Sequence, residues 1–246
     1  MNEKKSFTFG LHAVDALIHK QPERIIRLVV LRERQDQKIQ ALVEMAKENR
    51  IRVEFATRLE LDQMTDGENH QGAIAFCHAI KNYSEDDLEE ILDRVEKPFL
   101  LILDGVQDPH NLGACLRSAD AAGVHAVIAP RDKAVGITPT VSKVASGAAE
   151  SVPFIQVTNL ARTMKFLQER GVWIYGAAGE ADVNLFQAKL TGPVAIAMGA
   201  EGSGLRRLTR EHCDVLLKIP MNGSVSSLNV SVATGVFLFE VVRQRG

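Results

Sequence analysis

Six short runs of consecutive apolar residues limit the possible folds of this chain more than any other feature. They are FLLIL (99–103), AVIA (126–129), VPFIQV (152–157), VWIYG (172–176), VAIAM (194–198) and VLLKI (215–219). Because they lack polar alternation, they are typical of a parallel sheet that helices cover on both faces. Apolar spacing between the runs predicts helices at 111–122, 139–149, 160–170, 205–212 and 227–243. A parallel α/β domain is therefore expected over residues 98–246.

Residues 1–80 carry a shorter α/β pattern. Apolar residues recur at helical spacing over 11–18 and 39–46, and strand-like runs occur at 27–31, 52–56 and 72–77. We therefore expect a separate small α/β domain. Residues 81–97 are expected to form a linker, from Lys81 to Tyr83, and an entry helix that Ser84 caps, with acidic residues favourably placed in its first turn.

The composition is that of ordinary globular domains, with 46% hydrophobic and 24% charged residues among 246. No apolar run approaches the roughly 20 residues that span a bilayer, and MNEKKSFTFG lacks the apolar segment of a signal peptide. We therefore expect a cytoplasmic protein. Cys77, Cys115 and Cys213 lie too far apart in sequence for a disulfide framework or a zinc site, and we expect them to be small buried side chains.

The charge pattern is compatible with RNA binding but does not require it. The net charge of −2 lacks the basic excess that is common in nucleic-acid-binding proteins. Over residues 20–52, however, basic side chains outnumber acidic ones. Most charge runs are simply solvated faces, so this segment alone indicates little.

The turn LDGVQDPHNLGACLR (103–117) follows the first predicted strand, and ligands of parallel sheets bind at the carboxyl ends of strands. Asp108 and Pro109 predict the N-cap and first residue of a helix. Arg117 lies off the apolar stripe of that helix, so it is either a surface charge or able to reach the strand ends or a partner chain. A metal site from the acidic and histidine side chains of this turn is disfavoured, because no second cluster completes it.

Two later turns also stand out. In AMGAEGSGLRR (197–207), glycines that let backbone approach a ligand surround Glu201. In KIPMNGSVSSLNVSVATG (218–235), a glycine turn precedes Ser226 and Ser227, either of which can cap the last helix. That helix is apolar on nearly every face, so we expect it to be buried all round, against a second subunit as well as its own sheet.

The three turns resemble the signature motifs of the SpoU family, within the SPOUT class of RNA methyltransferases. The first motif corresponds to Asn111, Gly113 and Arg117. The second corresponds to Met198, Gly199, Glu201, Gly204 and Leu205. The third corresponds to Ile219, Pro220, Met221, Gly223, Ser227, Leu228, Asn229, Val230 and Ser231. Residues 10–13 and 70–75 further resemble the flanks of the family's substrate-binding domain.

The resemblance implies a domain organisation and an activity. Residues 1–80 would form an RNA-binding domain similar to a ribosomal-protein fold, and residues 98–246 a methyltransferase domain with a deep trefoil knot, in a homodimer. The expected reaction transfers a methyl group from S-adenosylmethionine to a ribose 2′-hydroxyl. Within the family, the chain is most similar to members that act on a guanosine of bacterial 23S ribosomal RNA, in the peptidyl-transferase region.

The resemblance also implies roles for individual residues, with no metal. The expected catalytic residues are Asn111, Arg117, Glu201, Ser227 and Asn229. The expected cofactor-binding residues are Met198, Gly199, Ile219, Met221 and Leu228. In this family the arginine is proposed to activate the hydroxyl, but arginine side chains stay protonated. We therefore expect Arg117 to bind phosphate, orient the ribose and stabilise the developing alkoxide.

Three alternatives remain open from the sequence. The chain could be a non-catalytic RNA-binding protein of the same fold, or a methyltransferase that acts on transfer RNA. A dinucleotide-dependent oxidoreductase shares the alternation of strands and helices. It is disfavoured because no G-x-G-x-x-G pattern follows the first long strand.

Overall fold

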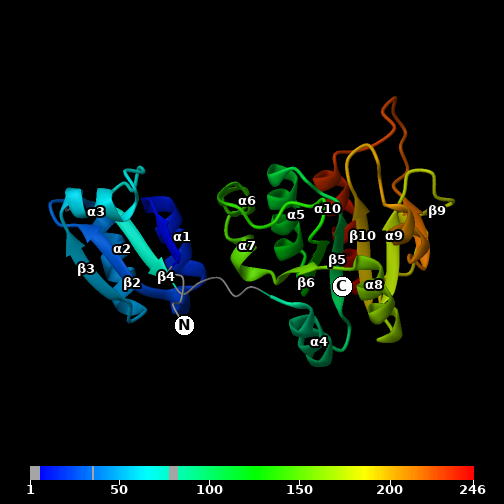
Figure 1. Ribbon diagram of the computed structural model, residues 1–246, viewed down its shortest axis with the longest axis horizontal. Helices are drawn as coiled ribbons and strands as arrows, with labels where there is room; N and C mark the ends of the chain where they lie inside the picture. The colour runs from blue at the N-terminus through cyan, green and yellow to red at the C-terminus, as the bar shows by residue number, and fades with distance from the viewer. Residues whose placement is uncertain (1–5, 35, 78–82) are drawn as a thin grey trace. The chain divides into compact units, whose positions relative to one another are not determined.

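A computed structural model describes residues 6–34, 36–77 and 83–246 and divides the chain into two compact units, residues 1–81 and 82–246 (Figure 1). Of the predicted linker, Lys81 and Asn82 lie outside the described residues. Tyr83 forms a parallel bridge with Ile155, so it is part of unit 2. None of the helices in the described ranges has the length and apolarity needed to cross a membrane.

Unit 1 contains a mixed four-stranded sheet in the order β1-β4-β2-β3, in which β2 and β3 are parallel and β4 is antiparallel to both of its neighbours. Helices α1 and α2 pack on one face, and α3 covers part of the other. The elements are β1 (Ser6–Phe9), α1 (Leu11–Lys20), the 3₁₀ turn η1 (Pro22–Arg24), β2 (Ile25–Leu31), α2 (Gln37–Glu48), β3 (Arg52–Ala56), α3 (Arg58–Met64) and β4 (Ala73–Cys77).

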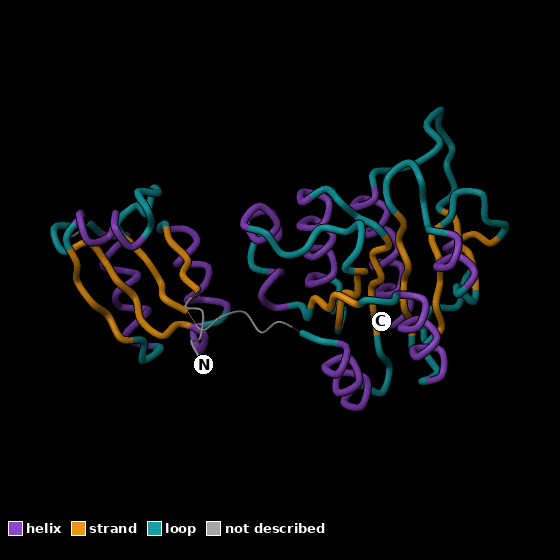
Figure 2. The backbone as a smooth tube through the Cα atoms, in the orientation of Figure 1, coloured by secondary structure: helices purple, strands orange, loops and turns teal. Residues whose placement is uncertain are grey.

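Unit 2 contains a seven-stranded sheet in the order β7-β6-β5-β10-β8-β11-β9, and every neighbouring pair is parallel. Figure 2 shows the helices distributed over its two faces. The elements are α4 (Glu85–Arg94), β5 (Phe99–Asp104), α5 (Pro109–Ala121), β6 (Ala126–Pro130), α6 (Pro139–Ala145), α7 (Ala148–Ser151), β7 (Phe154–Val157), α8 (Leu160–Glu169), β8 (Trp173–Ala177), β9 (Val183–Asn184), η2 (Leu185–Gln187), β10 (Val194–Gly199), α9 (Arg207–Glu211), β11 (Val215–Lys218) and α10 (Val230–Arg245).

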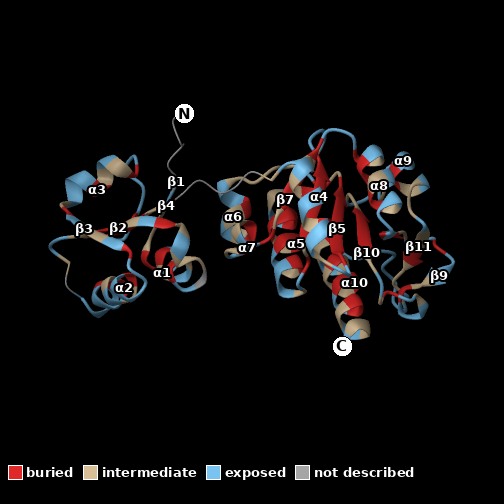
Figure 3. Cartoon of the chain, turned by 90° about the horizontal axis from the view of Figure 1, so that it is seen from below, coloured by how far each residue is buried: buried red, intermediate tan, exposed pale blue. Residues whose placement is uncertain are grey.

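The predicted parallel sheet is confirmed, and burial explains its sequence pattern. Every residue of β5 is buried: Leu101 and Leu103 pack on the side of α5 and α10, whereas Leu100 and Ile102 pack on the side of α4 and α8. The central strands β5 and β10 accordingly lie between helices whose outer surfaces are exposed (Figure 3). An apolar side chain is needed on both faces, which is why polar alternation is absent.

Three helix predictions need correction. The helix expected at 139–149 is broken, because Ser146 and Gly147 adopt left-handed backbone with φ of 53° and 94°. The last helix begins at Val230, and neither Ser226 nor Ser227 caps it. In this single chain, that helix is also not buried all round: Val232 and Phe239 are 54% and 49% exposed. The helix expected at 205–212 is shorter, Arg207–Glu211.

Candidate functional site

The carboxyl ends of β10 and β11 and the start of α10 surround a cavity of about 530 Å³. All five residues expected to bind the cofactor line this cavity: Met198, Gly199, Ile219, Met221 and Leu228. Three of the five residues expected to be catalytic line it too: Glu201, Ser227 and Asn229. The structure thus brings together the second and third motifs, which are separated in sequence by an entire helix and strand.

One wall of the cavity is a tight turn that requires glycine. Ala200 and Gly204 pair through hydrogen bonds of 3.2 and 2.9 Å, and Gly202 and Gly204 have φ of 77° and 66°, which glycine adopts without strain. Gly199 is required for a different reason. A Cβ atom there would overlap the backbone of Gly204 and Leu205. The turn therefore folds back on the end of β10 in a way that only glycine permits.

An ion pair between a buried carboxylate and an exposed arginine fixes the far end of this turn. Asp104, at the end of β5, is fully buried and lies in register with Gly199. Its carboxylate accepts hydrogen bonds from the backbone N–H of Arg206 at 2.8 Å and from Nε of the same arginine at 2.5 Å. This role of Asp104 was not predicted from the sequence. The available signal was an acidic residue that ends an otherwise apolar strand.

Asn229 joins the three motifs. Its Nδ2 donates to Oδ1 of Asn111 at 3.0 Å and to a carboxylate oxygen of Glu201. Its Oδ1 accepts from the backbone N–H of Ser231 at 2.9 Å and from the hydroxyl of the same serine at 2.6 Å, which makes Asn229 the N-cap of α10. Both ends of the side-chain amide are occupied, so its orientation is fixed.

Asn111 reaches this network because α5 begins where the sequence predicts. Asp108 is confirmed as the N-cap, accepting from the N–H of His110 at 3.1 Å, and Pro109 is the first helical residue. Asn111 is 8% exposed and borders a second cavity of about 320 Å³ that Glu201 also lines. The nearby motif residue Gly113 serves packing, since a Cβ there would lie 2.7 Å from Cβ of Val144 in α6.

Arg117 is not part of this cluster. It is exposed, lines neither cavity, and forms no hydrogen bond or ion pair with the described residues of its own chain. It lies six positions after Asn111, which places it about 9 Å along α5 and roughly 120° around the axis. Within one chain, the expected activator of the hydroxyl and the expected cofactor pocket therefore lie apart.

The described residues of unit 2 offer neither a metal-binding cluster nor a reactive thiol. Within the described ranges, no cluster of three or more His, Cys, Asp or Glu could hold a metal ion, and Asp104 is engaged by Arg206 instead. Burial raises the pKa of Cys115 to about 11 and that of Cys213 to about 12, so neither thiol is a nucleophile at neutral pH. Cys77 and Cys115 are buried as expected, whereas Cys213 is partly exposed.

Comparison with known proteins covers both units. Residues 98–239 match the SpoU rRNA Methylase family, and residues 7–83 match the RNA 2′-O ribose methyltransferase substrate binding domain. The chain is 60% identical over 243 residues to the 23S rRNA (guanosine-2′-O-)-methyltransferase RlmB of Shewanella oneidensis, with 99% of each chain covered. It is 57% identical over 237 residues to RlmB of Escherichia coli K12, covering 96% and 98%.

A solved structure shares the fold. The SpoU methyltransferase AviRb from Streptomyces viridochromogenes, determined in complex with AdoMet, superposes with a TM-score of 0.76 at 24% identity, over 98% of this chain and 90% of that one. Sequence motifs, cavity and fold agree with the family match. The chain belongs to the SpoU family of rRNA methylases.

Proposed function

We propose that this protein transfers a methyl group from S-adenosylmethionine to the ribose 2′-hydroxyl of a guanosine in 23S ribosomal RNA, in the cytoplasm. The observation that carries the proposal is the side chain of Asn229, which ties Asn111 and Glu201 together at the edge of the cavity. Near-full-length identity of 57–60% to proteins named as 23S rRNA guanosine methyltransferases supports the substrate.

The residues of the cavity fit S-adenosylmethionine. Its volume of about 530 Å³ is within the usual range for sites of small organic ligands. Ile219, Met221 and Leu228 offer apolar contact, and the glycine turn from Gly199 exposes backbone to a ligand. When bound, S-adenosylmethionine supplies a methyl group on a positively charged sulfur. The chain has to hold that group and present a ribose hydroxyl to it in line.

A homodimer would supply the missing arginine. Val232, Val236 and Phe239 form an apolar stripe along α10, spaced so that they share one face, and the outer two are exposed. Helix α10 packs against α5, which carries Arg117. We propose that a second copy covers this stripe and that each Arg117 acts at the cavity of the other copy.

In this arrangement, Arg117 is the group that orients and stabilises the nucleophile, the ribose 2′-oxygen. As a protonated, exposed guanidinium, it can bind an RNA phosphate in a bidentate manner and orient the attached ribose. Its charge stabilises the ribose oxygen as the hydroxyl proton passes to water. Asn111, Glu201 and Asn229 hold the motif loops against one another, and Ser227 is an exposed residue at the cavity wall.

The path of the chain near the cavity supports the proposed trefoil knot. Strand β11 lies beyond β8, yet α10 packs against α5 and β10 on the other side. Residues 219–229 therefore return across the carboxyl ends of the strands and meet the turn 199–206 at the cavity. We propose that the returning segment is threaded through that region.

Unit 1 is proposed to recognise the RNA, as a domain similar to a ribosomal-protein fold. Its match to the family's substrate-binding domain supports this role. The basic segment at 20–52 is a weaker argument than its sequence indicates, because Arg27 and Arg52 both pair with Glu54 and Arg34 pairs with Asp36. The side chain of Lys20 lies outside the described residues.

A tritiated-methyl transfer assay tests the reaction and the substrate together. In vitro transcripts of 23S rRNA and of a tRNA pool are incubated with the protein and labelled S-adenosylmethionine, and the modified nucleotide is mapped. Label in a guanosine ribose of the 23S transcript is expected. Label confined to tRNA would reassign the substrate, and none in either RNA would contradict the proposed activity.

Arg117→Ala tests whether Arg117 acts in methyl transfer while the cavity alone binds the cofactor. We expect turnover to fall by at least about 1000-fold, a loss of roughly 4 kcal/mol of transition-state stabilisation, because positioning and charge are removed together. Affinity for S-adenosylhomocysteine, measured by calorimetry, should stay within about threefold, since Arg117 does not line the cavity. Lost cofactor affinity with normal turnover at saturation would refute the assignment.

A further inference from the structure

Unit 1 contains a cavity of about 560 Å³ that the methyl-transfer site does not use. Its walls come from the end of β2, the start of α3 and the loop 67–72 that precedes β4. These three segments lie on one compact unit. The charged groups that line the cavity are Arg34, Arg58, Asp62 and Glu68.

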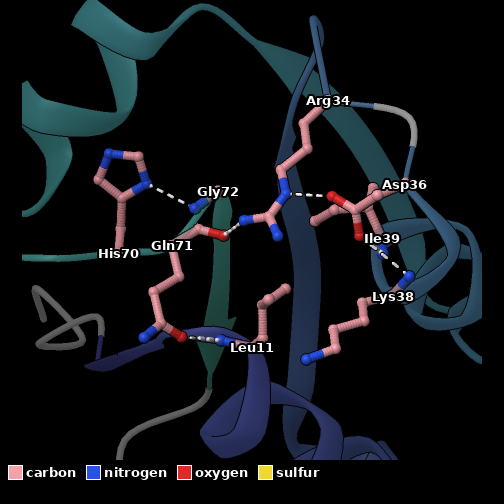
Figure 4. A network of polar contacts seen from close by, with 8 residues as sticks. All are labelled: Leu11, Arg34, Asp36, Lys38, Ile39, His70, Gln71 and Gly72. Atoms are coloured by element: carbon pink, nitrogen blue, oxygen red, sulfur yellow. Dashed lines mark hydrogen bonds and ion pairs between the residues drawn. The ribbon is translucent and has the colours of Figure 1, made fainter.

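A network of polar contacts holds the loop in its conformation (Figure 4). Arg34 donates from Nη1 to the carbonyl oxygen of Gln71 at 2.7 Å and from Nε to Asp36. The side chain of Gln71 accepts from the N–H of Leu11 at 3.1 Å, which ties the loop to α1. In this position Gln71 has left-handed backbone with φ of 51°, a conformation that is rare and strained outside glycine.

His70 fixes the orientation of the Asp62 carboxylate, a hydrogen-bond acceptor at the wall of the cavity. The imidazole is buried, and its Nδ1 accepts from the N–H of Gly72 at 3.0 Å, so Nε2 carries the ring proton. Nε2 donates to Oδ1 of Asp62 at 3.0 Å. Across the described chain, the other oxygen of Asp62 has no hydrogen-bond partner, and the side chain is 45% exposed at the cavity.

Arg58 supplies a free donor beside this acceptor. It is the first residue of α3, whose N-terminus Thr57 and Glu60 already close with a capping box. The arginine is exposed, lines the cavity and forms no hydrogen bond or ion pair with the residues that the structure describes. Folding of unit 1 therefore leaves the guanidinium of Arg58 and one carboxylate oxygen of Asp62 unused at the same cavity, together with the exposed carboxylate of Glu68.

We infer that this cavity binds an unpaired nucleotide of the RNA substrate, with Arg58 donating to the edge of its base and Asp62 accepting from it. The inference rests on the proposed function of unit 1 and names the site within it. A phosphate alone would be repelled by the carboxylate, whereas base edges carry donors and acceptors side by side. Proteins read RNA sequence mainly at such unstacked bases.

Three variants of the full-length protein test the inference with the 23S transcript. Arg58→Ala removes the donor. Asp62→Asn should keep the bond from His70, because Nε2–H requires an oxygen, and so turns an NH₂ group toward the cavity in place of the acceptor. Arg52→Ala is the matched control: it removes the same charge from unit 1, on an exposed side chain that does not line the cavity.

Arg58→Ala and Asp62→Asn are each expected to raise the KM for RNA about 10-fold, with kcat and S-adenosylhomocysteine affinity unchanged. Arg52→Ala should raise it by no more than about threefold. The direction of the change in KM for Asp62→Asn is decisive. Loss of a negative charge by itself would strengthen nonspecific binding to RNA and lower the KM. A lowered or unchanged KM for Asp62→Asn overturns the inference, as does an effect of Arg58→Ala no larger than that of the control.

Filter binding of the same RNA separates this inference from the proposed function. If the wild-type protein binds the transcript without methylating it, and both cavity variants weaken binding, the cavity assignment stands and the proposed activity fails. If methylation is normal and the variants match the control, only the cavity assignment fails. A change of oligomeric state without a change in RNA affinity, seen by light scattering, would assign the cavity to protein contacts and overturn it.

Discussion

The cavities of unit 1 and unit 2 are similar in volume, about 560 and 530 Å³, but they use their polar side chains differently. In unit 2, both the nitrogen and the oxygen of the Asn229 amide form hydrogen bonds within the chain, and the buried carboxylate of Asp104 accepts from Arg206. In unit 1, Arg58 and one oxygen of Asp62 are left without partners among the described residues. Saturated contacts preserve a shape, whereas unsatisfied donors and acceptors are available to a ligand.

Gly199→Ala is expected to break the shape of the unit 2 cavity most severely. The added Cβ would overlap backbone, which cannot rotate away as a side chain can. We expect a loss of about 3 kcal/mol in S-adenosylhomocysteine affinity, or roughly 100-fold by calorimetry, as at the upper end for overpacking. RNA binding by unit 1 should be unaffected.

Gly179→Ala provides the control for this variant. Gly179 lines the same cavity, has an ordinary φ, and a Cβ there would meet no atom within 4 Å. If both alanine variants lose affinity equally, the close approach at position 199 is not the reason glycine is needed there.

Asn229→Asp should separate the two uses of this side chain. Aspartate is as good an N-cap as asparagine, so the start of α10 should keep its stability. The donor to Asn111 is lost, and a carboxylate faces Glu201. We expect kcat to fall roughly 30-fold, about 2 kcal/mol, with little change in melting temperature. Unchanged turnover would show that Asn229 acts only as a cap.

A third prediction uses the pH dependence of unit 2. Burial raises the pKa of Cys115 from an ordinary 9.0 to about 11, so the unfolded chain ionises this thiol first. Its contribution to stability is therefore complete below pH 9 and is lost as pH rises toward 11. At pH 10 the loss should be about 1.5 kcal/mol, measured by urea unfolding. Because the pKa of Cys213 is raised as well, Cys115→Ala should reduce this part of the slope by about half; an equal slope in that variant would contradict the assignment.

The sequence was most informative where one local rule decides the structure. Unbroken apolar runs predicted the parallel sheet, because each strand is buried on both faces. Asp108 and Pro109 predicted the start of α5 from capping alone. By contrast, β1 has four residues and α3 buries only Leu61, so neither carries a periodic signal. Ser146 broke a predicted helix by a left-handed turn that serine rarely adopts.

The residues of the candidate site could be predicted from the motif resemblance, but the contacts between them could not. The link between Asp104 and Arg206 spans 102 residues, a separation over which no sequence period acts. The position of Arg117 depends on a face of α5 that a single chain leaves exposed. In unit 1, the cavity is built from a strand end, a short helix and a loop, and no motif covers all three.

The smallest effect concerns backbone strain in unit 1, away from its cavity. Arg50 follows the C-cap of α2 with φ 58°, and the next N–H, that of Ile51, bonds back to Ala46 at 2.8 Å, a helix ending that favours glycine. Arg50→Gly should stabilise unit 1 by about 0.5–1 kcal/mol, net of the greater freedom of glycine in the unfolded chain.

Arg50→Ala removes the same charge and keeps the strained conformation, so the difference between the two variants in urea unfolding isolates the backbone. Equal stability of the two would show that the left-handed residue costs nothing here. Among the described residues of unit 1, the other left-handed residues that are not glycine are Asp66 and Gln71, beside and within the loop that lines its cavity, and the same pair of substitutions at those positions would show whether strain is stored there.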